Sequence, residues 1–133
     1  MELKAEILVE WEVVTVNDLD HYPENFVYSF VNPKHEVLYV GTAHLESPKT
    51  EIPKMLSRLG LKAGNVQVLI GYLNSIASNQ YFTKVSLKKF EGFLHYKYQP
   101  TLNKTINFED VEMNNLVVKG DDLLAVVRAN MFH

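Results

Sequence analysis

Cysteine is absent from all 133 residues, so the chain can form neither a disulfide nor a thiolate metal site. Long hydrophobic runs are also missing, because no apolar stretch approaches the roughly 18 residues that span a bilayer. The first residues carry scattered acidic side chains and no uninterrupted apolar stretch, unlike a signal peptide. We therefore expect a cytoplasmic protein that does not associate with membranes.

The composition is that of a folded chain. Hydrophobic residues make up 47% of the sequence and charged residues 22%, which excludes a mostly disordered protein. A chain of 133 residues suits one domain and is too short for two. We therefore treat residues 1–133 as a single domain.

Positive charge is concentrated in the middle of the sequence. The formal net charge is −3, whereas a general nucleic-acid coat protein is usually basic. Residues 49–104 nevertheless contain nine lysines or arginines and only two acidic residues, and both flanking segments are acidic. This middle segment could form one phosphate-attracting face. Its lysines could equally be solvated residues on helix surfaces, and the sequence does not choose between the two.

Hydrophobic periodicity predicts an α+β fold. Two β-rich runs, 26–32 and 37–43, flank a short polar turn and predict an antiparallel hairpin. A helical stripe follows, beginning at Ser47 or Thr50 and reaching Leu61, because Pro53 leaves its start open. A buried strand over 66–73 and a helix over 86–98 come next. We expect a small three-stranded antiparallel sheet flanked by helices. Additional N- and C-terminal elements are a strand at 6–16, a strand at 116–120 and an apolar segment at 123–131.

The helix over 86–98 carries a carboxylate close to its apolar stripe. Glu91 falls about 20° from Tyr98, at the edge of the arc that holds Leu87, Phe90 and Leu94. Burying a carboxylate is costly unless it is paired, protonated or bound to a metal. A structural salt bridge or a solvent-exposed helix edge would also explain this position, so Glu91 is a candidate functional residue with two structural alternatives.

Tyr28 and Tyr39 lie in the middle of the two hairpin strands. Aromatic residues there usually serve cross-strand packing. Gly41 follows Tyr39 within a run of β-forming residues, and a glycine inside a strand often marks a close approach of the backbone or a bulge.

Taken together, these segments resemble the GIY-YIG nuclease family. The segments Phe26-Val27-Tyr28 and Tyr39-Val40-Gly41 are similar to the paired signature that names the family, although Phe26 replaces its first glycine. The segment from Glu91 to Asn103, with Gln99-Pro100 before the asparagine, resembles the family's closing motif. The resemblance covers residues 26–103 and leaves 1–25 and 104–133 as extensions.

The resemblance implies a metal-dependent site. In that family the tyrosines orient or deprotonate the attacking water, the glutamate holds one divalent metal and the asparagine braces the site. These roles would fall to Tyr28, Tyr39, Glu91 and Asn103. The metal would be Mg²⁺ or Mn²⁺ on Glu91, since a lone carboxylate with waters is a normal Mg²⁺ site.

The family's phosphate-binding arginine is replaced here. Lys49 stands at the expected position, and a helix that starts by Pro48 would direct it inward, about 20° from Leu56. Arg58, the nearest arginine, projects about 160° away from Leu56 on the same helical projection. Lysine holds phosphate as a point charge but lacks the bidentate fork of arginine.

Further nucleic-acid contacts are expected around the motifs, at Gly41, His44, Arg58, Lys88 and Lys89. His44 follows the hairpin closely and could contact phosphate, or it could simply be exposed. The remaining histidines lack zinc-ligand spacing.

The sequence therefore predicts a metal-dependent endonuclease that hydrolyses phosphodiester bonds, with DNA favoured over RNA. The alternative is a catalytically impaired module that binds nucleic acid or a protein partner. Sequence-specific cutting needs more recognition surface than the nuclease core offers. A homodimer, a partner subunit or structure-selective cutting would each meet this need, and the sequence does not choose among them.

Overall fold

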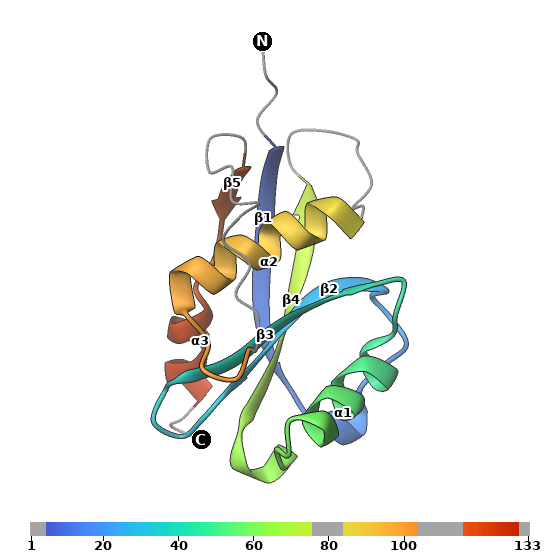
Figure 1. The fold of residues 1–133 in the computed structure, drawn as a ribbon, viewed down its shortest axis with the longest axis vertical. Coiled ribbons are helices and arrows are strands. Elements are labelled where there is room, and N and C mark those ends of the chain that lie inside the picture. The colour runs from blue at the N-terminus through green and yellow to red at the C-terminus, as the bar shows by residue number, and fades with distance from the viewer. Residues whose placement is uncertain (1–4, 76–83, 104–115, 131–133) are drawn as a thin grey trace.

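A computed structural model describes residues 5–75, 84–103 and 116–130, and it has an α+β fold (Figure 1). Its sheet has the strand order β3-β2-β4-β1-β5. The strands are β1 (Ala5–Val14), β2 (Asn25–Val31), β3 (Val37–His44), β4 (Gln67–Ser75) and β5 (Leu116–Lys119). The helices are α1 (Pro48–Arg58), α2 (Lys84–Tyr98) and α3 (Leu123–Ala129), and two 3₁₀ turns cover Val16–Asp18 and Ala63–Asn65.

The predicted hairpin and the strand after α1 form one side of the sheet. β2 pairs antiparallel with β3 on one edge and with β4 on the other, so these three strands are the expected antiparallel unit. The terminal extensions enlarge this same sheet: β1 pairs antiparallel with β4, and β5 pairs parallel with β1. β3 consequently lies at one edge of the sheet, and its outer side is free for other segments.

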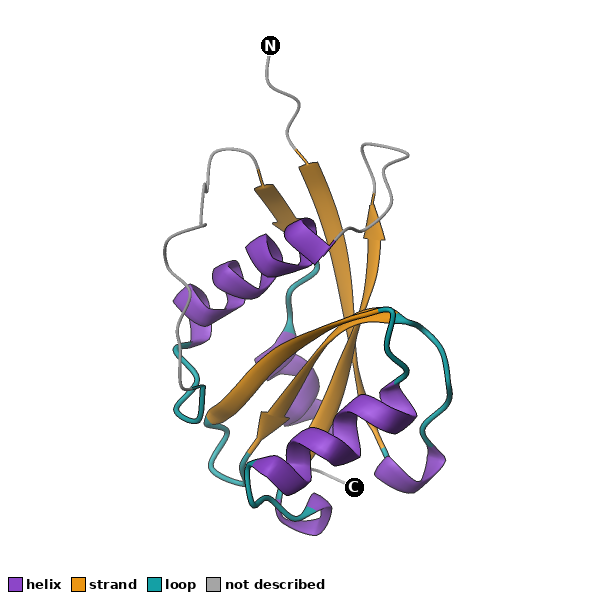
Figure 2. Ribbon diagram, turned by 45° about the vertical axis from the view of Figure 1, so that its right-hand side comes forward, coloured by secondary structure: helices purple, strands orange, loops and turns teal. Residues whose placement is uncertain are grey.

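The helices cover opposite faces of the sheet (Figures 1 and 2). Successive residues of a strand point to alternate faces, and the two faces of β2 pack into different clusters. One cluster joins Phe26, Tyr28 and Phe30 to Ile52, Met55 and Leu56 of α1. The other joins Val27 and Val31 to Phe90 and Leu94 of α2 and to Leu123 and Val127 of α3. Because β3 is an edge strand between α1 and α2, side chains from both faces can reach its outer side.

α1 begins at Pro48 rather than at a later residue. The Ser47 side chain accepts a hydrogen bond from the Thr50 amide at 3.2 Å, and Pro48 occupies the first turn, where its missing N–H costs nothing. Pro53 lies inside the helix and is exposed. Ser47 therefore decides the start of α1, and Pro53 is accommodated in its second turn.

The inward stripe predicted for α2 is present. Leu87, Phe90 and Leu94 are each at most 1% exposed. α2 starts at Lys84 and ends at Tyr98, two residues before Pro100. No helix in the described ranges is long and apolar enough to cross a membrane.

A buried carboxylate joins the two ends of the chain to α2. Asp121, between β5 and α3, accepts hydrogen bonds from the Trp11 indole at 2.8 Å and the Tyr98 hydroxyl at 2.9 Å. It also pairs with the Lys97 ammonium at 2.6 Å. Its charge is thus compensated by three partners, as a buried carboxylate requires.

Candidate active site

A cleft of about 460 Å³ opens at the β3 edge of the sheet, between the last turn of α1 and the middle of α2. Its lining combines hydroxyl, carboxylate and cationic groups from both helices. The lining residues are Tyr28, Tyr39, Thr42, Glu51, Met55, Arg58, Leu59, Lys88, Glu91, His95, Leu102 and Asn103. The cleft therefore brings together Tyr28, Tyr39, Glu91 and Asn103, which the sequence motifs singled out.

The two tyrosines form a coupled pair. Their ring centroids are 5.9 Å apart, and the Tyr28 hydroxyl donates a hydrogen bond to the Tyr39 hydroxyl. Burial raises the pKa of Tyr28 far above that of a free phenol, and the Tyr39, Glu51 and Glu91 side chains add to this rise. Burial also raises the pKa of Tyr39. Both phenols are therefore protonated near neutral pH, so they can donate hydrogen bonds but are poor proton acceptors.

Gly41 leaves the space in which the Tyr28 ring lies. A Cβ at this position would come within 2.5 Å of Tyr28 Cζ and 2.8 Å of Tyr39 Cε1. The close approach of the backbone that we expected at Gly41 is therefore an approach to the rings of Tyr28 and Tyr39. Gly41 is buried, and its lack of a side chain admits the Tyr28 ring; its expected contact with nucleic acid stays a prediction.

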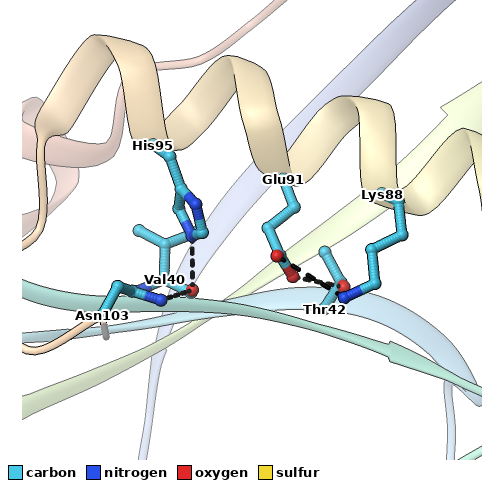
Figure 3. A network of polar contacts seen from close by, with 6 residues as sticks. All are labelled: Val40, Thr42, Lys88, Glu91, His95 and Asn103. Atoms are coloured by element: carbon cyan, nitrogen blue, oxygen red, sulfur yellow. Dashed lines mark hydrogen bonds and ion pairs between the residues drawn. The ribbon is translucent and has the colours of Figure 1, made fainter. Parts of the chain in front are cut away.

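Glu91 projects from α2 onto β3 (Figure 3). The Thr42 hydroxyl donates to its Oε2 at 2.8 Å, and the Lys88 ammonium lies 3.7 Å from its Oε1. The Glu91 side chain is 14% exposed, whereas Lys88 is 52% exposed. The carboxylate is thus partly buried and neutralised by a lysine of its own helix, which can move away into solvent.

Asn103 and His95 both hold the backbone of Val40 (Figure 3). The Asn103 side chain accepts from the Val40 amide at 3.0 Å and donates to the Val40 carbonyl at 2.9 Å, which imitates a paired strand. His95 Nε2 lies 3.2 Å from the same carbonyl oxygen. The neighbouring Leu102 amide donates to the Leu38 carbonyl at 2.7 Å. Asn103 therefore braces the edge strand between Tyr39 and Gly41.

The cations of the cleft are Arg58 and Lys88, and the inward position expected for Lys49 is wrong. Lys49 is exposed and is not a lining residue, although α1 does begin at Pro48. Lys49 lies in the first turn, about 13 Å along the helix axis from Arg58 in the last turn. A helical projection gives the direction of a side chain around the helix axis but not its position along that axis. It therefore favoured Lys49 over Arg58.

Two further contacts expected from the sequence are His44 and Lys89. His44 is partly buried and does not line the cleft. The side chain of Lys89 is outside the described part of the structure.

Glu51 was missed by the sequence analysis: it is buried and lines the cleft. Glu51 falls about 40° from Met55 on the helical projection, so the argument used for Glu91 could have identified it.

The oxygen donors of the cleft fit a hard divalent cation that keeps part of its water shell. Within the described residues, no three histidine or acidic side chains converge closely enough to hold a metal on their own. The cleft offers the Glu91 carboxylate and, beside it, the Thr42 hydroxyl. Mg²⁺ commonly binds through one or two carboxylates with water and substrate phosphate filling the other positions.

A second cleft, of about 280 Å³, is acidic, whereas the first cleft balances two carboxylates with two cations. Its lining includes the carboxylates of Glu12, Asp18 and Asp20 and no lysine or arginine from the described ranges. A phosphodiester would be repelled there, so the cleft beside β3 is the better candidate for an anionic substrate.

No protein-family model, curated protein or solved structure matches this chain.

Proposed function

We propose that the chain is an endonuclease of the GIY-YIG type, which hydrolyses phosphodiester bonds of DNA or RNA with the help of a divalent cation. One observation carries the proposal. Tyr28, Tyr39, Glu91 and Asn103 are spread over 76 positions of sequence, yet all four line one cleft. The order hairpin, helix, strand and helix, with β4 beside β2, also agrees with the sheet that the sequence resemblance implies.

Each group of the cleft has a role suited to this reaction. The protonated Tyr39 hydroxyl donates a hydrogen bond that orients the attacking water or a phosphate oxygen. Tyr28 uses its own hydroxyl proton to hold Tyr39 in place. Arg58 and Lys88 offset the negative charge that builds up on the phosphate during attack, which is the term that most often dominates such catalysis. Asn103 acts through Val40, because it holds the strand that carries Tyr39.

Glu91 is the residue that would hold the cation, with Thr42 orienting its carboxylate. When bound, such a cation polarises the phosphate and stabilises the leaving oxygen. Lys88 now neutralises Glu91 from a largely exposed position, so a cation and a phosphate could displace it at little cost. DNA remains the favoured substrate over RNA.

The alternative is a module that binds nucleic acid without cutting it. The Lys88–Glu91 ion pair favours this alternative, because the ammonium already occupies the place where a metal would neutralise the carboxylate. The exposed position of Lys49 favours it as well, since no cation is placed at the family's arginine position.

Replacing Glu91 by glutamine tests the proposal. Single-stranded, duplex and branched DNA and structured RNA would be incubated with the protein in Mg²⁺ or Mn²⁺. Wild-type protein should cleave at least one of them. Glu91→Gln should lose on the order of 10²-fold or more in rate, because the amide keeps the shape and removes the charge. Glu46→Gln, an exposed glutamate outside the cleft, is the matched control.

The outcomes separate the two candidates. Metal-dependent cleavage that Glu91→Gln abolishes supports the endonuclease. Binding without cleavage by wild-type protein rejects the endonuclease and supports the module. Cleavage that is unchanged in Glu91→Gln removes Glu91 from the reaction.

A further inference from the structure

We propose that Glu51 is the proton acceptor of the cleft, which removes a proton from the attacking water. The inference rests on the proposed phosphodiester hydrolysis and assigns a catalytic role to a residue outside the sequence motifs. Glu51 projects from α1, whereas Glu91 projects from α2, and the two carboxylates line the same cleft beside the tyrosine pair.

The other candidates for this role are poorly suited. The tyrosine hydroxyls are protonated, and Tyr28 is only 1% exposed. His95 Nε2 contacts the Val40 carbonyl, its Nδ1 is buried, and the residue is only 1% exposed. Glu91 has Thr42 on one carboxylate oxygen and Lys88 beside the other, and the proposed function already assigns it to the cation.

Glu51 has the features that a proton acceptor needs. Its side chain is 10% exposed, and its Oε1 pairs with the Lys54 ammonium at 3.2 Å. Because Oε1 is the oxygen that pairs with Lys54, Oε2 is the oxygen that would accept a hydrogen bond from a water in the cleft. The carboxylate is near enough to both phenols to raise the pKa of Tyr28 and Tyr39.

Several charged and titratable groups border the cleft together with this carboxylate. They come from every element that borders the cleft: Tyr28 and Tyr39 from the hairpin, Lys54 and Arg58 from α1, and Lys88 and Glu91 from α2. A bound phosphate would occupy the same space, and Arg58 and Lys88 would offset its repulsion of Glu51.

The chemical step balances as a simple hydrolysis. The water oxygen forms a new bond to phosphorus while its proton passes to the Glu51 carboxylate. The bond between phosphorus and the leaving sugar oxygen breaks, and that oxygen takes a proton from solvent. Glu51 then returns its proton to solvent, so no oxidant or further reactant is needed.

The test uses variants of Glu51 in the cleavage assay. Glu51→Gln should lower kcat by about 10²–10⁴-fold, the usual contribution of a general base, with substrate binding changed little. Its residual rate should rise about tenfold per pH unit, because hydroxide from solvent must replace the base. Formate should restore part of the activity of Glu51→Ala, since a small carboxylate can enter the space left by the side chain.

Two controls separate a chemical role from a structural one. Lys54→Ala removes the ion-pair partner and keeps the carboxylate, so it should retain most of the activity. Glu46→Gln again serves as the exposed control. If Glu51→Ala does not fold, the pH profile of the nearly isosteric Glu51→Gln decides the question.

Each outcome is informative. Full activity of Glu51→Gln overturns the assignment and leaves the endonuclease standing. Lost activity that keeps the wild-type pH profile and is not rescued by formate also overturns it, in favour of a structural role. Wild-type protein that cleaves nothing rejects the proposed function, and the role of Glu51 falls with it.

Discussion

At the scale of single residues, the cleft shows which side chains can be found from a sequence pattern. Tyr28 and Tyr39 became candidates through the resemblance to the GIY-YIG motifs, since their strand pattern alone favours packing. Glu91 was also indicated by its position beside an apolar helical stripe, which is unusual for a carboxylate. Their convergence depends on packing between α2 and β3, which local periodicity does not describe.

Arg58 lines the cleft, whereas Lys49 stands at the arginine position of the sequence motif. Replacing each in turn tests which of the two contacts the phosphate. Arg58→Ala should lower the single-turnover cleavage rate by about 10²–10³-fold, because it removes a donor for charge developing on the phosphate. Lys49→Ala should leave the rate within a few-fold of wild type, since Lys49 is exposed and lies outside the cleft. The reverse result would restore Lys49 as the counterpart of the family's arginine.

At the scale of elements, the hairpin, the helices α1 and α2 and the strand after α1 were predicted correctly, while their exact bounds were not. The segment that forms α3 was predicted only as apolar. Pro53 left the start of α1 open between Ser47 and Thr50. In the structure the helix begins at Pro48, directly after the Ser47 cap. α2 starts two residues before the expected Ser86, and the side chain of Ser86 lies outside the described residues. Asn103 was identified by its motif, but its partner Val40 was not, because this contact joins residues 63 positions apart.

The brace on β3 predicts how this edge strand responds to the loss of Asn103. Asn103→Ala leaves the Val40 amide without its acceptor, and an unsatisfied buried group costs about 1–3 kcal/mol of folding free energy. We expect faster hydrogen exchange at Val40 and a lower urea midpoint. Asn130→Ala is the control, because Asn130 only caps the end of α3 through Val126. Unchanged exchange at Val40 would show that His95 and Leu102 hold β3 without the asparagine.

At the scale of the whole molecule, the sheet is larger than the motifs predicted. The sequence indicated a strand near each end, but not that both would join the hairpin sheet. The alternating pattern of β1 predicts a strand and leaves its partner open, and the short β5 offers little pattern at all. Strand order depends on contacts between distant parts of the chain, which local patterns do not describe; the contacts of Asp121 with Trp11, Lys97 and Tyr98 are of this kind.

The buried tyrosine makes folding stability depend on alkaline pH. Burial raises the pKa of Tyr28 in the folded state, while an unfolded tyrosine ionises near pH 10. Stability is therefore fully present below about pH 10 and is lost above it, by up to about 1.4 kcal/mol per pH unit. Urea midpoints measured from pH 8 to 11.5 should fall less steeply for Tyr28→Phe than for wild type.

The control for this measurement is Tyr22→Phe, because Tyr22 is 73% exposed. Its midpoints should follow the wild-type slope. Slopes are compared rather than absolute values, since Tyr28→Phe also loses the hydrogen bond to Tyr39. Equal slopes for wild type and Tyr28→Phe would show that another group controls alkaline unfolding.

The parallel pairing of β5 with β1 has a consequence for the order in which the chain can fold during translation. β1 is made early, but its neighbours β4 and β5 are made late, and Trp11 waits 110 positions for Asp121. At synthesis rates of about 5–20 residues per second, this interval lasts roughly 5–20 seconds. Throughout it, Val9 and Trp11 lack the cover that Leu123 and Val127 later provide. Until α3 has been synthesised, the nascent chain therefore leaves this apolar face of β1 without its α3 cover, even once β4 has paired with β1.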